Sequence, residues 1–589
     1  MNYTLSNQDQ TTPPKSASII AAIKRLWPFL KADKLRIAGA FLAILINSGL
    51  TILAPITIGH AVDHFVLTRN SHGLLVYTGL VFLIYLGALL AGTIQTRLMG
   101  GVGQRVLFRL RSALFTRIQE LPVAFFTQNK TGDLISRINN DTDKLNQFFS
   151  RSIMQLVGNV FVIIGAAIAM LVVQPNLGRF ALVPAVGLAL IAFVTSGWVK
   201  RKNFQSLQTL GGLSAEIQES LENMKVIIAF NRRDYFRKRF QSVNETNYRA
   251  AIWAGVANNT YVPLFSLASN VGTLIVVAYG LHLISIGQLT FGVLVSYLAY
   301  VNRFYDPLRQ MAQLWADVQQ AAAGWERIAE ILNLSTNLPV ISADRQNKTS
   351  SASVIAFDHV SFGYAADRQV LTDVSFSLAA GKTYAFVGPT GGGKTTTASL
   401  IARLYDPTEG MVSLEGRDLR TVDAEERASA IGFILQDPFL FTGTVGENIQ
   451  YGGQHQRLST SDLTTLLKKE GLADLLERFD QGLDTPVSAS GGSLSLGQKQ
   501  LIAFIRAVLR HPKLLILDEA TANIDTVTEQ LLGKILDRLP KSTTRVVIAH
   551  RLNTIENADE IFFVNSGTVT RAGSLKDAVA MLKEQSRTS

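Results

Sequence analysis

The stretch TYAFVGPTGGGKTTTASLIARL, residues Thr383–Leu404, decides the fold class of the C-terminal part of this chain. It contains the pattern G-x-x-x-x-G-K-[ST], from Gly388 to Thr395, after an apolar run and before a helical pattern. A phosphate-binding loop requires this context, because glycines let backbone N–H groups wrap phosphate oxygens and a helix N-terminus favours negative charge. The sequence therefore predicts a nucleoside triphosphate site in an α/β domain.

Two residues of this loop carry most of the predicted chemistry. Lys394 is expected to neutralise the β- and γ-phosphates, and the Thr395 hydroxyl is expected to reach Mg²⁺. A chance glycine-rich turn would lack the flanking strand and helix. The other predicted contacts with ATP come from the loop and the first helical turn: Gly388, Pro389, Thr390, Gly391, Gly392, Gly393 and Thr396.

The second half of the site is predicted in KLLILDEAT, residues Lys513–Thr521. The apolar residues Leu514–Leu517 predict a buried strand, whose end presents Asp518 as an Mg²⁺ ligand with Glu519 beside it. Adjacent carboxylates at a strand end are often only a solvated turn, but here they follow a phosphate-binding loop. Glu519 is therefore the predicted general base for the water that attacks the γ-phosphate.

Short β-rich runs alternate with helical patterns across residues 354–589. The runs are VIAFDHVSF, TYAFVG, KLLILDE and TRVVIAH. This alternation is typical of an α/β domain with a largely parallel core sheet. The preceding segment, residues 335–353, is polar and rich in turn-forming residues, which predicts a linker.

The N-terminal part of the chain predicts a membrane domain. Apolar residues make up 47% of the chain, charged residues only 17%, and the mean hydropathy is +0.21, which is unusual for a soluble protein. Six stretches approach the ~20 residues that a helix needs to cross ~30 Å of hydrocarbon, which the buried helices of a soluble core rarely do. They are residues 37–59, 73–94, 153–173, 180–199, 261–287 and, more weakly, 289–305.

We predict a polytopic α-helical membrane domain over residues 18–334, preceded by a polar tail over residues 1–17. The tail shows no cleavable signal, and the segment IIAAIKRLWPFLKADK after it predicts an amphipathic helix on the membrane surface. The chain contains no cysteine, which excludes disulfides, thiolate metal sites and cysteine nucleophiles.

Lysine and arginine residues concentrate in two long loops, after the second and the fourth predicted spans. Basic loops stay in the cytoplasm, so the net charge of +11 indicates membrane orientation rather than nucleic-acid binding. Both termini and the nucleotide domain are then expected in the cytosol. Each loop runs for about 50 residues, and a helical hairpin of that length would project roughly 30 Å from the membrane. We interpret both loops as stalks.

Four motifs in order carry a family resemblance: the phosphate-binding loop, LSLGQKQ, LLILDEA and VVIAHRL. This order resembles the ATP-binding cassette (ABC) transporters, and six preceding spans with long cytoplasmic loops resemble the exporters of that family. The resemblance covers roughly residues 20–570. It implies a dimer, because the phosphate-binding loop of one nucleotide domain faces the LSGGQ segment of another, and this chain has one of each.

The resemblance assigns roles to further residues. Tyr364 in SFGY matches the aromatic residue that stacks on adenine, and Gln436 in ILQDP matches the glutamine that senses Mg²⁺ and the attacking water. His550 in IAHRL resembles the switch histidine that contacts the γ-phosphate, and Asp525 in TANID resembles the aspartate of a loop that crosses to the other domain. FFTQNKTGDLISRINNDTDKL and AFNRRDYFRKRF resemble the coupling segments of the two stalks, although a solvated charged helix would look similar.

The LSLGQ segment departs from the family pattern. It keeps Ser495, Gly497 and Gln498, which should face the partner's γ-phosphate, but Leu496 replaces a glycine and Ala489 stands where exporters usually carry glutamate. The residues that serve this chain's own ATP are intact. We interpret this asymmetry as one member of a heterodimeric exporter. The alternative is a homodimer that tolerates leucine.

The predicted cargo is a hydrophobic or amphipathic compound, such as a drug, a lipid or a peptide. No charged residue lies in the interior of the six predicted spans, and intramembrane charges usually mark ion pathways or charged cargo. No motif encodes the direction of transport, so an importer or an ATP-gated channel stays an alternative, whereas the spans exclude a soluble ABC ATPase. The half-transporter format and the absence of cysteine favour a bacterial inner membrane.

Overall fold

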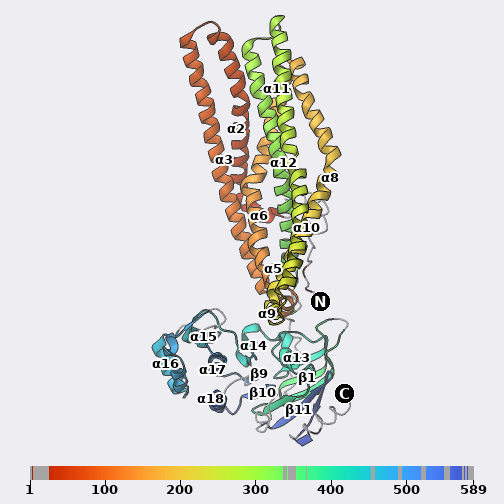
Figure 1. Ribbon diagram of the computed structural model, residues 1–589. Coiled ribbons are helices and arrows are strands. Elements are labelled where there is room, and N and C mark those ends of the chain that lie inside the picture. Colours follow the sequence, from red (N-terminus) through yellow and green to blue (C-terminus); the bar gives the residue numbers. More distant parts are fainter. Residues whose placement is uncertain are drawn as a thin grey trace. The chain divides into compact units, whose positions relative to one another are not determined.

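The computed structural model describes residues 26–335, 353–365, 368–452, 458–488, 494–518, 526–548 and 558–573, together with residues 3, 5, 338, 341, 576, 577 and 580. The chain forms two compact units. The nucleotide unit consists of Met1–Thr4, Leu121–Gln128 and Ser335–Ser589, and the helical unit consists of Leu5–Glu120 and Asn129–Leu334. Figure 1 shows long helices running alongside one another in the helical unit and a layered α/β arrangement in the nucleotide unit.

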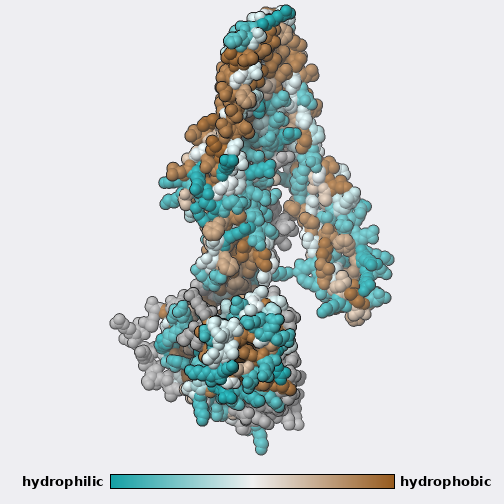
Figure 2. All heavy atoms as spheres, turned by 90° about the vertical axis from the view of Figure 1, so that its left-hand side faces the viewer, coloured by the Kyte–Doolittle hydropathy of each residue, from teal (hydrophilic) through white to brown (hydrophobic). Residues whose placement is uncertain are grey.

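Six long helices of the helical unit correspond to the six predicted spans. They are α2 (Lys34–Ala61), α3 (Ser71–Gln119), α7 (Ile153–Val173), α8 (Pro175–Glu222), α11 (Tyr261–Ser285) and α12 (Phe291–Asn333). Helix α11 ends two residues before its span does, and helix α12 begins two residues after its span does. The predicted polytopic helical domain is thus confirmed. By length and composition alone, 5 helical segments of the described residues are apolar enough to cross a membrane, and they include every one of these helices except α12. In Figure 2 the apolar surface gathers around the upper part of the helical unit, and polar side chains cover most of the lower part.

Helix α12 packs against α2, α7 and α11. Three buried tyrosines of α12 donate hydrogen bonds to neighbouring helices. The Tyr300 hydroxyl donates to the carbonyl of Ile52 on α2 at 2.7 Å. The Tyr305 hydroxyl donates to Ala181 on α8 at 2.9 Å, and the Tyr297 hydroxyl donates to the carbonyl of Met170 on α7. Each phenol thus reaches a backbone carbonyl of a different neighbouring helix. Such bonds fix the position of α12 where few polar partners exist.

Both predicted stalks are helical hairpins, as expected. In the first, α3 turns through α4 (Val123–Gln128), α5 (Thr131–Ser136) and α6 (Thr142–Gln147), with the π-helical turns η3 (Arg137–Asp141) and η4 (Phe148–Ser152) leading into α7. In the second, α8 turns through the short α9 (Met224–Ala229) into α10 (Arg233–Asn259), which packs along α8.

The first stalk is tied to α12 by a buried arginine. Arg137 is 1% exposed, and its guanidinium contacts Asp133 at 2.8 Å and Glu330 of α12 at 2.6 Å. Arg327 of α12 also reaches Asp133, at 2.6 Å. A buried charge needs such partners, because its desolvation is otherwise costly. The network therefore holds the stalk and the lower half of α12 in a fixed register.

The nucleotide unit contains a six-stranded core sheet in the order β12-β11-β3-β10-β9-β6. Its strands are β3 (Thr383–Val387), β6 (Ile431–Ile434), β9 (Leu514–Asp518), β10 (Thr544–Ile548), β11 (Glu560–Asn565) and β12 (Thr568–Arg571). All neighbours are parallel except β12 with β11, which confirms the expected parallel core. Strand β9 is buried throughout, as its apolar run predicts.

The run VIAFDHVSF differs from this expectation, because it forms β1 (Ser353–Phe362) in a separate antiparallel sheet of order β2-β1-β4-β5. The other strands are β2 (Leu371–Ala379), β4 (Glu409–Leu414) and β5 (Arg417–Asp418). The connection between β1 and β2 spans only residues 363–370, which is too short for the crossover that a parallel pair requires. Local hydrophobicity could not distinguish the two sheets.

Candidate nucleotide site

The phosphate-binding loop joins β3 to α13 (Lys394–Ile401) and is shaped by glycines. Gly391 and Gly393 have φ angles of 83° and 116°, which side chains rarely tolerate. A Cβ atom at Gly388 would lie 2.0 Å from the carbonyl oxygen of Val564, and one at Gly392 would lie 2.7 Å from the same atom. The loop therefore packs against β11 at a distance that only glycine allows. Glycines of this kind let backbone N–H groups approach phosphate oxygens.

Lys394 is placed at the start of α13 and is only 5% exposed. Its ammonium donates to the carbonyls of Gly388 and Pro389, each at 2.9 Å. These bonds hold the charge inside the loop, where a β- or γ-phosphate would bind. This position agrees with the predicted role of Lys394.

Thr395 and Asp518 lie together although 123 residues separate them in the sequence. The Thr395 hydroxyl donates to Asp518 Oδ1 at 3.4 Å, at the point where β9 ends. A hydroxyl and a carboxylate are the hard oxygen ligands that Mg²⁺ takes in nucleotide sites. The pair therefore fits the predicted ion, whose charge would offset that of the phosphates.

Tyr364 lies beside the loop and is 47% exposed. Its hydroxyl lies 3.1 Å from the hydroxyl of Thr396, in the first turn of α13. Phe362 and Tyr405 both meet the Tyr364 ring edge to face, with centroids 5.0 and 5.1 Å away. Burial of the hydroxyl raises the pKa of Tyr364 above its usual value. This ring is oriented by three contacts, and its exposed part fits the predicted stacking on adenine.

The topology of the core sheet brings the remaining motifs to one edge. Strands β3, β10, β9 and β6 are parallel neighbours, so their carboxyl ends meet, and ligands bind at such edges. Ile548 of β10 is the register partner of Asp518, and the exposed Gln436 follows β6 by two residues. Glu519, Asp525 and His550 lie outside the described residues.

The LSLGQ segment starts α17 (Leu496–Val508) with a complete capping box. The Gln498 N–H donates to the Ser495 hydroxyl oxygen at 3.2 Å, and the Ser495 N–H donates to Gln498 Oε1 at 2.9 Å. Leu496 is the first helical residue and has no left-handed φ. Gly497 is buried against Thr528, whose hydroxyl would lie 3.1 Å from an added Cβ. The leucine therefore leaves the fold of this segment intact. Ala489 lies outside the described residues.

Three contacts at these sites were not predicted from the sequence. Gln498 Nε2 donates to the carbonyl of Arg478 at 2.7 Å, Thr528 packs on Gly497, and Val564 backs the phosphate-binding loop. Each contact uses a backbone atom or a small side chain of a residue far along the chain. No local sequence signal marks such residues.

The comparisons with known proteins identify the chain. Residues 37–308 match the family model of the ABC transporter transmembrane region, and residues 371–522 match the family model described as ABC transporter. The chain is 34% identical to the uncharacterized ABC transporter ATP-binding protein YfiC of Bacillus subtilis, over 95% of its length and 92% of that protein. It belongs to the ABC transporter family. Half-transporters of this family work as dimers, and the protein is an ATPase coupled to transport.

Two further relatives of this ABC transporter bear on its function. The fatty acid ABC transporter ATP-binding/permease protein of Mycobacterium bovis is 32% identical over 85% of the chain and 79% of that protein. The solved structure of a bacterial Atm1-family ABC exporter with ATP bound superimposes with a TM-score of 0.75, at 26% identity over 94% of this chain and 96% of that one. The exporter arrangement of a helical membrane domain followed by a nucleotide domain is thus confirmed.

Proposed function

We propose that the protein is one half of a dimeric exporter that uses ATP to move hydrophobic or amphipathic compounds out of a bacterial cell by alternating access. The Thr395–Asp518 contact carries the nucleotide part of this proposal, because it joins the two halves of an ATP and Mg²⁺ site. The likeness to an exporter over nearly the whole chain supports the direction, and the relative named for fatty acids supports an amphipathic cargo.

The proposed roles in hydrolysis follow from the shared edge of the core sheet. The loop from Gly388 to Thr396 binds the phosphates, Tyr364 stacks on adenine, and Thr395, Asp518 and Gln436 hold Mg²⁺. Glu519 acts as general base for the attacking water, and His550 contacts the γ-phosphate. The membrane domain lies in the inner membrane, with both termini and the nucleotide unit in the cytosol, as the basic stalks indicate.

We further propose that the partner is a different half-transporter. The Ser495–Gln498 capping box is intact, so the helix start forms with leucine at position 496. We infer that the branched side chain of Leu496 hinders the approach of what the start of α17 meets. In the family arrangement, the start of α17 meets the partner's γ-phosphate. The weakened segment therefore serves a site on the partner that contributes little turnover. A homodimer that tolerates leucine is the competing assembly.

Transport in membrane vesicles of both orientations tests the proposed function. The assembled transporter should accumulate an amphiphile such as a fluorescent fatty acid in inside-out vesicles when ATP is supplied outside. Right-side-out vesicles loaded with ATP should lose it instead. Accumulation in right-side-out vesicles would show an importer, and ATP-independent equilibration in both would show a channel. Stimulation of ATP turnover by the same compound links transport to the nucleotide site.

A further inference from the structure

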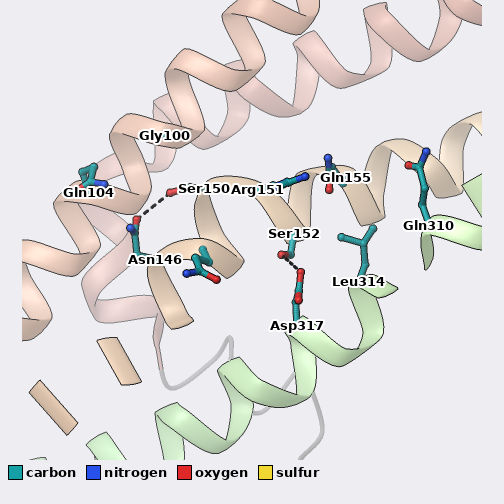
Figure 3. A pocket seen from close by; sticks show the side chains of 11 residues that line it. Gly100, Gln104, Asn146, Ser150, Arg151, Ser152, Gln155, Gln310, Leu314 and Asp317 are labelled. Atoms are coloured by element: carbon teal, nitrogen blue, oxygen red, sulfur yellow. Dashed lines mark hydrogen bonds between the residues drawn. The ribbon is translucent and has the colours of Figure 1, made fainter. Parts of the chain in front are cut away.

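The helical unit contains a polar cavity of about 830 Å³ at the level where η4 leads into α7. Figure 3 shows that α3 lines one side of it and α12 the other, with α6, η4 and α7 between them. This volume is in the range of sites that hold drug-sized ligands. Eleven residues line it, and only Gly100 and Leu314 among them lack a polar side chain. We call this cavity the polar chamber.

The lining of the polar chamber is balanced in charge and rich in carboxamides. Five side chains are amides: Gln104, Asn146, Gln147, Gln155 and Gln310. The charged side chains are one arginine, Arg151, and one aspartate, Asp317. Carboxamides donate and accept hydrogen bonds, so they suit a ligand with groups of both kinds. The chamber therefore does not fit a purely apolar compound.

Both charged groups are exposed and have bonding capacity left. Among the described residues, Arg151 has no carboxylate partner. Asp317 accepts one hydrogen bond there, from the Ser152 hydroxyl to Oδ2 at 2.7 Å, so Oδ1 is available (Figure 3). Arg151 and Asp317 therefore bring opposite charges to the lining of the same chamber.

The polar residues follow helical spacing on two facing helices. Arg151, Gln155 and Asn159 are four positions apart along η4 and α7, so they share one face. On α12, a second face carries Arg303, Asp306, Gln310, Leu314 and Asp317, at steps of three or four positions. The amide of Asn159 donates to Gln310 at 3.3 Å and joins the two faces. The two helices therefore carry polar side chains toward the same side of the bundle.

The polar surface continues beyond the Asn159–Gln310 bond. A second cavity of about 470 Å³ is lined by both residues of this bond, of which Gln310 also lines the polar chamber. Its other polar lining residues are Thr51, Asn302, Arg303 and Asp306. It again contains one arginine and one aspartate, the latter 3.9 Å from Arg309. A ligand leaving the polar chamber along α12 would therefore meet the same kind of charges a second time.

We propose that the polar chamber binds the zwitterionic part of the cargo, with Arg151 on its anionic group, Asp317 on its ammonium group and the carboxamides on the polar groups between. This inference rests on the proposed export function and narrows its cargo class. The shared chemistry is an ammonium beside a carboxylate or a phosphate. It can come from a short peptide or from a phospholipid headgroup such as that of phosphatidylethanolamine.

Thermal unfolding and ATP turnover of the assembled transporter in nanodiscs test the proposal with matched probes. The soluble arm compares trialanine with free ends, its N-acetyl form and its C-terminal amide. The lipid arm compares nanodiscs of phosphatidylethanolamine with nanodiscs of phosphatidylglycerol. In one of the two arms, the zwitterionic probe should raise Tm or ATP turnover. In the soluble arm, blocking either charge of the peptide should raise the concentration that gives half of the effect about 10-fold, as expected for a lost charged contact.

Two variants assign the contacts. Arg151→Gln should remove the preference for the free carboxylate or phosphate, and Asp317→Asn should remove the preference for the free ammonium, each leaving the other preference. Arg249→Gln and Glu245→Gln are matched controls, because this exposed pair on α10, 2.9 Å apart, lies outside the chamber. If Arg151→Lys keeps the preference for the free carboxylate or phosphate, the contact depends on the positive charge.

Several results would overturn the proposal. One is the absence of any preference for a zwitterion in both arms, and another is a preference that survives both substitutions. A third is loss of dimer assembly in the variants, because the charges would then serve the subunit interface. The Tm readout needs no turnover. A transporter that hydrolyses no ATP but is stabilised by a zwitterion would therefore refute the proposed function while leaving the chamber a binding site.

Discussion

The ammonium of Lys394 shows how a single residue prepares the nucleotide site. It is 5% exposed and donates to two carbonyls of its own loop at 2.9 Å each. A buried ammonium is stable only with such acceptors, and phosphate oxygens are stronger ones. The loop thus holds the charge in place before a phosphate binds.

Lys394→Ala should lower ATP affinity at least about 10-fold, because it removes a charge-assisted bond to the phosphates, whereas membrane insertion should stay normal. Titration of the assembled transporter with a fluorescent ATP analogue measures the change. Lys469→Ala, on an exposed position of α16 (Thr460–Lys469), is the control and should bind as the unmodified protein does. Unchanged affinity in Lys394→Ala would contradict the assigned role.

Glu519→Gln should keep ATP binding but cut turnover at the site that it serves by at least ~10²-fold, the usual contribution of a general base. The amide has nearly the same shape as the carboxylate but cannot take a proton. Turnover and retained nucleotide should be measured on the same sample, with the exposed Glu425→Gln of α14 (Ala424–Ala430) as control. Normal hydrolysis by Glu519→Gln would reject the assignment.

At the scale of elements, different residues at the start of α17 stabilise the helix and can approach a ligand. Its capping box satisfies the helix end with Ser495 and Gln498, so the helix forms whichever residue occupies position 496. The same end presents N–H groups that can meet an anion on another subunit. We therefore propose that the family's glycine serves close approach to that anion rather than the fold.

Leu496→Gly distinguishes the two assemblies. In the proposed heterodimer, the restored segment caps a site of low activity, so total turnover should change less than about 2-fold, which is a change of about 0.4 kcal/mol in activation free energy. In a homodimer, both active sites would gain the glycine, and turnover should rise clearly. Steady-state ATP hydrolysis of the purified transporter measures this. Leu496→Ala is the matched control, because it removes the branched side chain without introducing glycine. A glycine substitution elsewhere, such as Leu207→Gly on α8, would weaken a helix interior and is therefore unsuitable.

At the scale of the whole molecule, the chain is a half-transporter. It carries one phosphate-binding loop and one LSLGQ segment, and an ABC transporter site needs one of each from two different subunits. Expressed alone, the chain should therefore show little ATP turnover, and it should gain activity when a half-transporter with an intact LSGGQ is co-expressed. Robust activity of the chain alone, stimulated by cargo, would instead establish the homodimer.

Oligomeric state and activity should be measured on the same preparations. A dimer of the chain alone without activity would still agree with the heterodimer, since both of its sites would contain Leu496. Inclusion of Leu496→Gly in that experiment supplies the control: restored activity of the lone chain would show that leucine alone had silenced the site.

Much of the architecture could be predicted from the sequence. The span over residues 153–173 coincides with α7, and TYAFVG, KLLILDE and TRVVIAH form the adjacent strands β3, β9 and β10. These features depend on hydropathy, periodicity and motif spacing, which are local. The individual roles of Glu519, Asp525 and His550 stay predictions, because these residues lie outside the described part of the chain.

The tertiary structure decided what depends on residues far apart in the sequence. It placed VIAFDHVSF in an antiparallel sheet, and it brought Thr395 to Asp518 across 123 residues. It also revealed the polar chamber, whose residues come from three parts of the chain that are far apart in the sequence: α3, the stretch from α6 to α7, and α12. Arg151 and Asp317 lie outside the predicted spans, and 166 positions separate them. Hydropathy is a property of neighbours along the chain, whereas a binding cavity is made by packing helices against one another.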